Sequence, residues 1–107
     1  MSNRVILVGH RKGDIIRKDT ELELYNLQYY VDGFIEPCAP AELRAQGIEL
    51  LCNEEGLLQQ LPYNENFFPF FFVGRLVILA VDGDRFTGLS DKQERFALDW
   101  LRNLPEI

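Results

Sequence analysis

The 107-residue chain is poor in the residues on which catalytic and metal sites depend. It contains one histidine, His10, and two cysteines, Cys38 and Cys52. The separation of the cysteines fits neither a zinc site nor a disulfide-rich secreted domain, so we expect two reduced, buried thiols. The sequence therefore predicts no metal site and no cofactor.

Long apolar runs are also absent. No run approaches the roughly 20 residues that a membrane-spanning helix needs. Met1 to Arg4 is followed by only four apolar residues, which is too few for a secretory signal. We therefore expect a cytoplasmic protein with no membrane partner. The apolar fraction of 47% and the charged fraction of 26% are typical of a globular protein, here one domain covering residues 1–107.

Basic residues are scarce in the middle of the chain. Residues 1–18 carry five bases and one acid, whereas residues 19–66 carry ten acids and one base, a net charge of −9. The whole chain has a net charge of −6. A segment this acidic repels a phosphate backbone and attracts a basic protein surface, so direct nucleic-acid binding is not expected. Solubility alone explains the same charge equally well.

The hydrophobic pattern predicts an α+β fold. Apolar runs at 4–9 and 77–81 predict strands, and the all-apolar run 77–81 predicts a central strand covered on both sides. The dipeptide Asp82-Gly83 is a strong signal for a hairpin. Shorter apolar runs bounded by turn residues predict the remaining strands, at 14–18, 34–38, 48–52, 57–61 and 85–89.

Amphipathic stretches predict the helices. The first covers about 21–31 and follows the capping-box pattern of Thr20–Glu23. The second covers about 91–104 and follows the same pattern in Ser90–Gln93. A short helix is expected within 40–47. Short connections favour a mostly antiparallel sheet of about five to seven strands, with the two longer helices packed on one face.

The segment Asn-Glu-Glu-Gly at 53–56 predicts a tight turn. Asn53 would bond its own backbone, and Gly56 would supply a left-handed position after the turn, joining strands 48–52 and 57–61 in a hairpin. Glu54 and Glu55 would then lie at the tip, where solvent leaves nothing to separate their pKa values for acid–base catalysis. No other pattern indicates an enzyme, and we expect no catalytic residues.

Five phenylalanines crowd into residues 67–72. Side chains alternate along a strand, so Phe70, Phe71 and Phe72 cannot all face one side. Either the fold covers both sides as core, or one side is exposed as a contact surface.

Four segments of the chain share a pattern. They are LQYYVDGFIEP, IELLCNEEGLLQQLPYN, the VG before an apolar strand, and DGDRFTGLSDKQ, together covering about residues 20–104. The pattern resembles a family of short uncharacterised proteins that are common in bacteriophages and in mobile elements of gut Firmicutes. This chain departs from the family at Asp32, where the family has a first glycine, and at Tyr63, where it has a second proline. The resemblance brings no catalytic residues with it.

What the resemblance implies is an interaction protein. Small proteins of mobile elements commonly block host defence nucleases of the restriction or CRISPR type, by presenting carboxylates to the basic surface that would hold DNA. We therefore expect a non-enzymatic inhibitor of a host nucleic-acid-binding defence protein, such as a nuclease. This function requires the acids to form one coherent face. The expected partner contacts are Glu21, Glu23, Glu54, Glu55, Glu65, Phe67, Phe68 and Phe70.

Two other functions fit the same sequence. A scaffold module of a mobile element would act as a homodimer, joined through an open sheet edge or through the phenylalanine cluster. A small-ligand-binding domain or an enzyme would have its pocket between helix 21–31 and the sheet, where Tyr25, Tyr29 and Tyr30 cluster.

Overall fold

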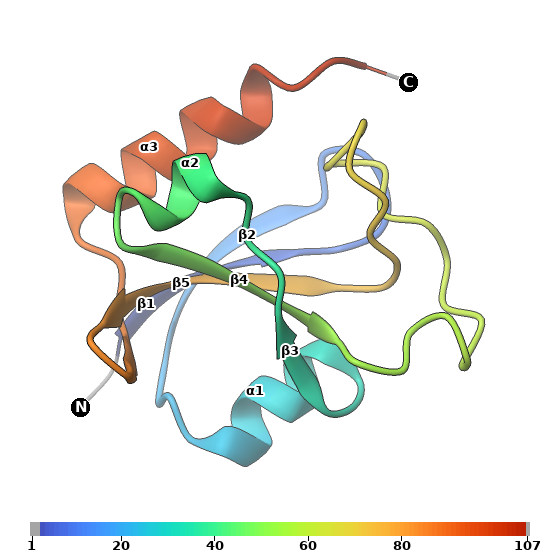
Figure 1. Cartoon of the computed structure of the whole chain (residues 1–107), viewed down its shortest axis with the longest axis horizontal. Helices are drawn as coiled ribbons and strands as arrows, with labels where there is room; N and C mark the ends of the chain where they lie inside the picture. The colour runs from blue at the N-terminus through green and yellow to red at the C-terminus, as the bar shows by residue number, and fades with distance from the viewer. Residues whose placement is uncertain (1–2, 107) are drawn as a thin grey trace.

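A computed structural model of the chain describes residues 3–106 and shows a sheet between helices (Figure 1). In chain order the elements are β1 (Asn3–Val8), β2 (Ile15–Thr20), α1 (Leu24–Val31), β3 (Ile35–Pro37), α2 (Ala41–Arg44), β4 (Ile48–Asn53), β5 (Leu76–Asp82), β6 (Arg85–Thr87) and α3 (Asp91–Arg102). Within these residues, six antiparallel strands form one sheet in the order β2-β1-β5-β4-β3, with β6 also paired to β5. The predicted α+β class and mostly antiparallel sheet are confirmed.

The hairpin predicted at Asp82-Gly83 forms between β5 and β6, and β1 and β2 form another. In the β1–β2 loop Gly13 has a φ of 87°, a value that favours glycine. In the β5–β6 hairpin Asp82 pairs with Arg85, so the two loop residues are Gly83 and Asp84 rather than Asp82 and Gly83. Gly83 has a φ of 65°, which suits the first loop position of a primed turn.

The two longer helices cover opposite faces of the sheet, so the prediction that they share one face is wrong (Figure 1). On one side Ala97 of α3 packs in the same cluster as Ile78 of β5. On the other side Leu27 of α1 packs in the same cluster as Val77 and Leu79. Because successive side chains of a strand point to opposite faces, the all-apolar β5 needs cover on both sides. Two helices on one face would leave half of this strand in water.

The helix boundaries differ in one respect from the prediction. The Ser90–Gln93 capping box is confirmed, since each residue's backbone N–H donates to the other's side chain, at 2.9 and 3.1 Å. The Thr20–Glu23 capping box is wrong, and α1 begins only at Leu24. Thr20 still belongs to β2, and its hydroxyl bonds to that of Tyr30 at 2.8 Å. A threonine engaged in this way cannot cap the helix.

The strand predicted at 57–61 does not form, and turns occupy residues 54–60 instead. The first turn is as expected, because the Asn53 side chain accepts from the backbone N–H of Glu55 at 2.7 Å. Gly56, however, is not in a left-handed conformation. It is buried, and a Cβ there would lie 2.7 Å from Val73 Cγ2, so close approach rather than backbone twist requires glycine.

None of the helices in residues 3–106 combines the length and the apolar character that a membrane-spanning segment requires.

Candidate functional site

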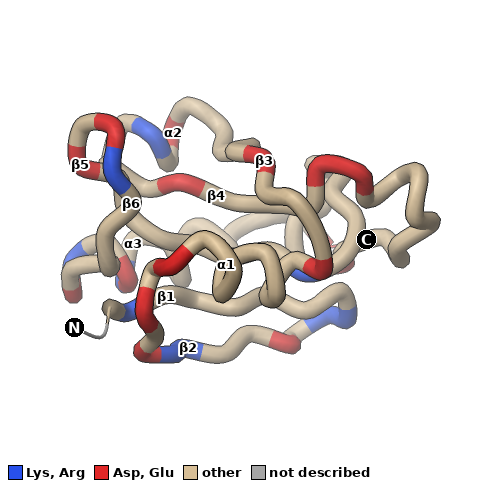
Figure 2. Tube along the Cα trace, turned by 90° about the horizontal axis from the view of Figure 1, so that it is seen from below, with Lys and Arg blue, Asp and Glu red and all other residues tan. Residues whose placement is uncertain are grey.

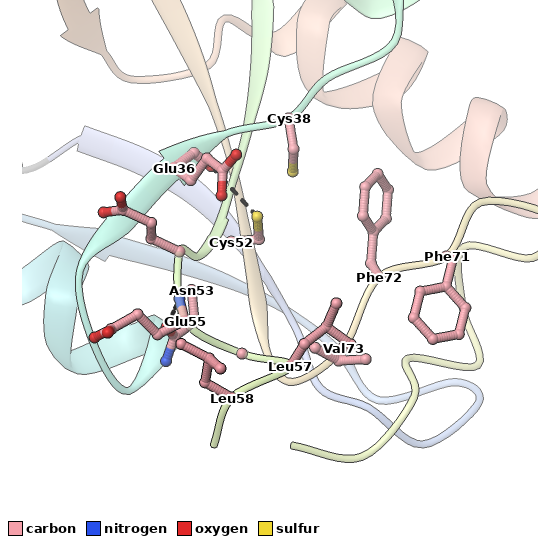
Figure 3. A pocket seen from close by; sticks show the side chains of 12 residues that line it. Glu36, Cys38, Cys52, Asn53, Glu55, Leu57, Leu58, Phe71, Phe72 and Val73 are labelled. Carbon is pink, nitrogen blue, oxygen red and sulfur yellow. Dashed lines mark hydrogen bonds between the residues drawn. The ribbon is translucent and has the colours of Figure 1, made fainter. Parts of the chain in front are cut away.

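A groove of about 490 Å³ lies between β3, the end of β4 and the long loop that joins β4 to β5. Figure 3 shows the carboxylates of Glu36 and Glu55 on one side of it and the rings of Phe71 and Phe72 on the other. Glu54 lines the groove as well. The volume lies within the range of about 300 to 1,000 Å³ that is usual for binding pockets.

The apolar wall of the groove is unusually exposed. Leu57, Leu58 and Phe71 are 69%, 82% and 68% exposed, and all three line the groove. Single exposed apolar residues are common, but adjacent ones that form a wall typically mark a contact surface. None of the residues that line the groove, among those the structure describes, is basic.

Two buried asparagines fix the position of this wall. The side-chain amide of Asn64 donates to the carbonyl of Gly74, two residues before β5, at 2.8 Å, and to that of Val8 in β1 at 3.3 Å. That of Asn66 donates to the carbonyls of Gly9 and Arg11, in the β1–β2 loop, both at 2.8 Å. Both asparagines are almost fully buried. They tie the β4–β5 loop to two neighbouring segments of the fold and satisfy backbone groups that would otherwise be orphaned.

The phenylalanine-rich segment divides between core and surface. Phe67 is fully buried, packs edge-on against Phe72 and lies 6.2 Å from the ring of Trp100 in α3. Phe70 lies 5.7 Å from the same tryptophan. Phe71 is the ring that faces solvent at the groove. Of the expected contacts, Phe67 therefore offers a partner no surface, and Phe68 and Phe70 are partly buried.

The ten acids of residues 19–66 do not form one coherent face. Figure 2 shows acidic positions spread along the molecule, several of them beside basic ones. Within residues 3–106, three of these acids form ion pairs with other described residues, at 2.8, 2.9 and 3.1 Å: Asp19 with Arg4, Asp32 with Arg75, and Glu49 with Arg44. The structure therefore does not support a single acidic face made by all ten acids.

The carboxylates expected to contact a partner lie in three separate places. Glu54 and Glu55 are exposed, as the turn predicted, and lie at the groove. Glu21 and Glu23 lie in the segment between β2 and α1, which Figure 1 shows on the opposite side of the molecule from the β4–β5 loop. The side chain of Glu65 accepts a hydrogen bond from the backbone N–H of Lys12 at 2.8 Å, which gives it a structural task.

Sequence reasoning missed Glu36 as a third groove carboxylate. Glu36 pairs directly with Cys52 in the β3–β4 ladder, which brings it beside the turn that carries Glu54. The only signal would have been the register of two strands separated by a helix. Leu57 and Leu58 were missed because an exposed leucine cannot be recognised from its sequence position alone. Phe71 belongs to the phenylalanine-rich segment but was not among the expected contacts.

The two cysteines lie in the wall of the groove as free thiols. Both are half-buried rather than fully buried. The interaction between the two thiols lowers the pKa of Cys52 and raises that of Cys38. Within residues 3–106, no group of three or more histidine, cysteine, aspartate or glutamate side chains is placed to hold a metal ion.

The tyrosines of α1 do not form a large pocket. Tyr25 and Tyr29 are 68% and 70% exposed. Tyr30 lines a cavity of about 110 Å³ between α1 and the sheet, which is smaller than most ligand pockets. A small-molecule site beneath this helix is therefore less well supported than the groove.

Comparison with known proteins gives one match. A family model described as "Domain of unknown function (DUF3846)" matches residues 3–102. No curated protein and no solved structure is significantly similar to the chain. The family match covers every strand and helix of the sheet layers described above. The chain therefore belongs to the DUF3846 family of domains of unknown function.

Proposed function

We propose that this chain is a non-enzymatic binding module whose groove holds a basic segment of a partner protein through one apolar anchor. The observation that carries the proposal is the pairing of an exposed apolar wall with free carboxylates. Glu36, Glu54 and Glu55 form no ion pair with the residues that the structure describes. A lysine or arginine would find an open partner there, and an apolar side chain would cover Leu58 and Phe71.

The two kinds of contact would do different work. Burial of the apolar wall supplies affinity at about 25 cal/mol per Å² of apolar surface removed from water. The carboxylates raise the association rate and select against acidic partners. A partner with only one of these features would bind weakly.

A narrower form of the proposal names the partner. We propose that the chain is a cytoplasmic inhibitor from a bacteriophage or mobile element, and that it occupies the basic surface of a host nucleic-acid-binding defence protein, such as a nuclease. Such a surface supplies the arginines and lysines that the groove needs. Three carboxylates suit a short basic stretch, whereas mimicry of a long DNA segment would need the broad acidic face that is absent.

Three labelled peptides of equal length test the groove. One is basic with a central leucine, one is basic with serine in its place, and one is acidic with a central leucine. Measured by fluorescence anisotropy, the first is expected to bind tightest. Leu58→Ser is expected to weaken its binding about tenfold, the loss of about 1.4 kcal/mol. The matched control is Leu24→Ser, an exposed leucine of α1 that is expected to leave binding unchanged.

Charge reversal has an equally close control. Glu54→Lys combined with Glu55→Lys is expected to weaken binding of both basic peptides. Glu21→Lys combined with Glu23→Lys changes the net charge by the same amount away from the groove. Equal weakening by the two double variants would reduce the effect to long-range attraction and contradict a groove site.

Light scattering tests the competing scaffold function. A second copy of the chain could cover the same apolar wall. A dimer that persists at high salt and is dissolved by Leu58→Ser would replace the present proposal.

A further inference from the structure

The two thiols of the groove wall face one another. Cys52 lies in β4 opposite Glu36, and Cys38 follows the end of β3, where its backbone N–H donates to the carbonyl of Leu50 at 2.9 Å. Figure 3 shows the two sulfurs pointing toward each other, between the carboxylate side and the aromatic side of the groove. The two cysteines of the sequence, 14 positions apart, thus lie close together at the surface of the groove.

The two sulfurs are not equivalent. The interaction between the two thiols lowers the pKa of Cys52 and, together with burial, raises that of Cys38. The nearby carboxylates of Glu36 and Glu49 oppose both thiolates, but the pKa of Cys52 stays below its usual value. The Cys52 sulfur also lies 3.5 Å from the carbonyl oxygen of Glu36, to which its protonated form donates. Attack on an electrophile therefore favours Cys52.

We propose that Cys52 and Cys38 form a thiol–disulfide exchange site, in which Cys52 attacks a low-molecular-weight disulfide such as glutathione disulfide and Cys38 resolves the adduct. In the first step the Cys52 thiolate bonds to one sulfur of the small disulfide. The sulfur–sulfur bond of that molecule breaks, and one small thiolate leaves and takes up the proton that Cys52 lost.

In the second step Cys38 gives up its proton and attacks the Cys52 sulfur. The mixed disulfide breaks, and the second small thiolate leaves with that proton. Two protein thiols are thus oxidised to one disulfide, and one small disulfide is reduced to two thiols. Since Cys38 lies just beyond a three-residue strand at the edge of the sheet, its backbone can adjust to the shorter sulfur–sulfur distance without breaking a central ladder.

Intact-protein mass spectrometry tests both steps on the full chain. The reduced protein is exposed to glutathione disulfide at neutral pH and quenched with acid. The natural sequence is expected to lose the mass of two hydrogens. Cys38→Ser is expected to stop at a single glutathione adduct on Cys52. Cys52→Ser is expected to form its adduct on Cys38 more slowly, because burial, which also raises the pKa of Cys38, remains in this variant.

Each contrary result overturns a defined part of the proposal. Accumulation of a stable glutathione adduct on the natural sequence would exclude Cys38 as the resolving thiol. Equal adduct rates for the two single variants would exclude the assignment of Cys52 as the attacking thiol. Reaction only in denaturant would exclude the site. If a serine variant loses its near-ultraviolet circular dichroism, the corresponding alanine variant takes its place. The mass measurement is independent of the peptide proposal, since it needs no partner.

Discussion

Single buried side chains decide where the exposed wall of the groove lies. The side-chain amide of Asn66 donates hydrogen bonds to two backbone carbonyls. Its oxygen accepts one from the backbone N–H of Gly13 at 2.8 Å. This role could not be predicted from the sequence, because asparagine in a loop more often marks a turn. Asp32 is a second case. It has a φ of 64°, at a position where the chain departs from the glycine of the family pattern, and its carboxylate is held by Arg75.

Removal of the Asn66 amide is expected to destabilise the fold. Asn66→Ala removes three hydrogen bonds to the backbone of the β1–β2 loop, including the one to the carbonyl of the buried Gly9, which lowers the free energy of unfolding by about 2 to 3 kcal/mol. Urea denaturation followed by circular dichroism measures the change. Asn103→Ala is the control, because the exposed Asn103 side chain donates only to the carbonyl of Asp99, and a change within about 0.5 kcal/mol is expected. Equal effects of the two substitutions would remove the proposed anchor.

At the scale of elements, periodicity located most of the sheet and failed where propensity is weak. The apolar runs of β1 and β5 and the capping box of α3 were recognisable, because burial and capping leave local patterns. Residues 57–61 alternate poorly and contain no β-branched residue, so nothing but their neighbours suggested a strand. The face of the sheet that each helix covers depends on how the connecting loops cross the edge of the sheet. This cannot be predicted from amino-acid composition.

The packed face of α3 carries one charged residue. Glu94 is almost fully buried, three and seven residues before the core residues Ala97 and Leu101, and therefore lies on the same stripe. Its carboxylate accepts from Arg4 of β1 at 2.8 Å and from Arg17 of β2 at 3.2 Å. A helix that packs on the sheet is thus also joined by charge to two of its strands.

This arrangement predicts a pH-dependent contribution to stability. The hydrogen bond from Arg4, helped by Arg17, holds the pKa of Glu94 below its usual value. The stabilisation is therefore complete above the unfolded pKa of about 4.3 and is lost as the pH falls through the lower folded value. Glu94→Gln is expected to lower the free energy of unfolding by about 1 kcal/mol at pH 7 and by little near pH 3.

Urea denaturation at the two pH values checks the expectation. The exposed Asp99→Asn is the control, since its contact with Arg102 at 3.7 Å should contribute little at either pH. If the difference in the free energy of unfolding between Glu94→Gln and the natural sequence is the same at pH 7 and pH 3, the stabilisation comes from packing and not from charge.

At the scale of the whole molecule, the charge of a segment did not predict the charge of a surface. The acids of residues 19–66 are spread over the molecule, and three of them, Asp19, Asp32 and Glu49, pair with Arg4, Arg75 and Arg44. Two of these bases, Arg4 and Arg75, lie outside the acidic segment, so no local count could reveal the pairing. The carboxylates at the groove, beside the apolar wall, form no ion pair with the described residues.

Salt separates the two contributions of this surface. The Debye length falls from about 8 Å at 0.15 M to about 3 Å at 1 M salt, so the carboxylates lose most of their attraction for a basic peptide. The apolar contact is not screened, and sulfate strengthens it because the ion is excluded from apolar surface. The basic peptide with a central leucine is therefore expected to keep measurable binding in 1 M sodium chloride and to regain affinity when sulfate replaces chloride. The basic peptide with serine is expected to lose binding in both salts. Identical loss for the two peptides would mean that Leu57, Leu58 and Phe71 contribute nothing, and that the groove attracts cations without holding a partner.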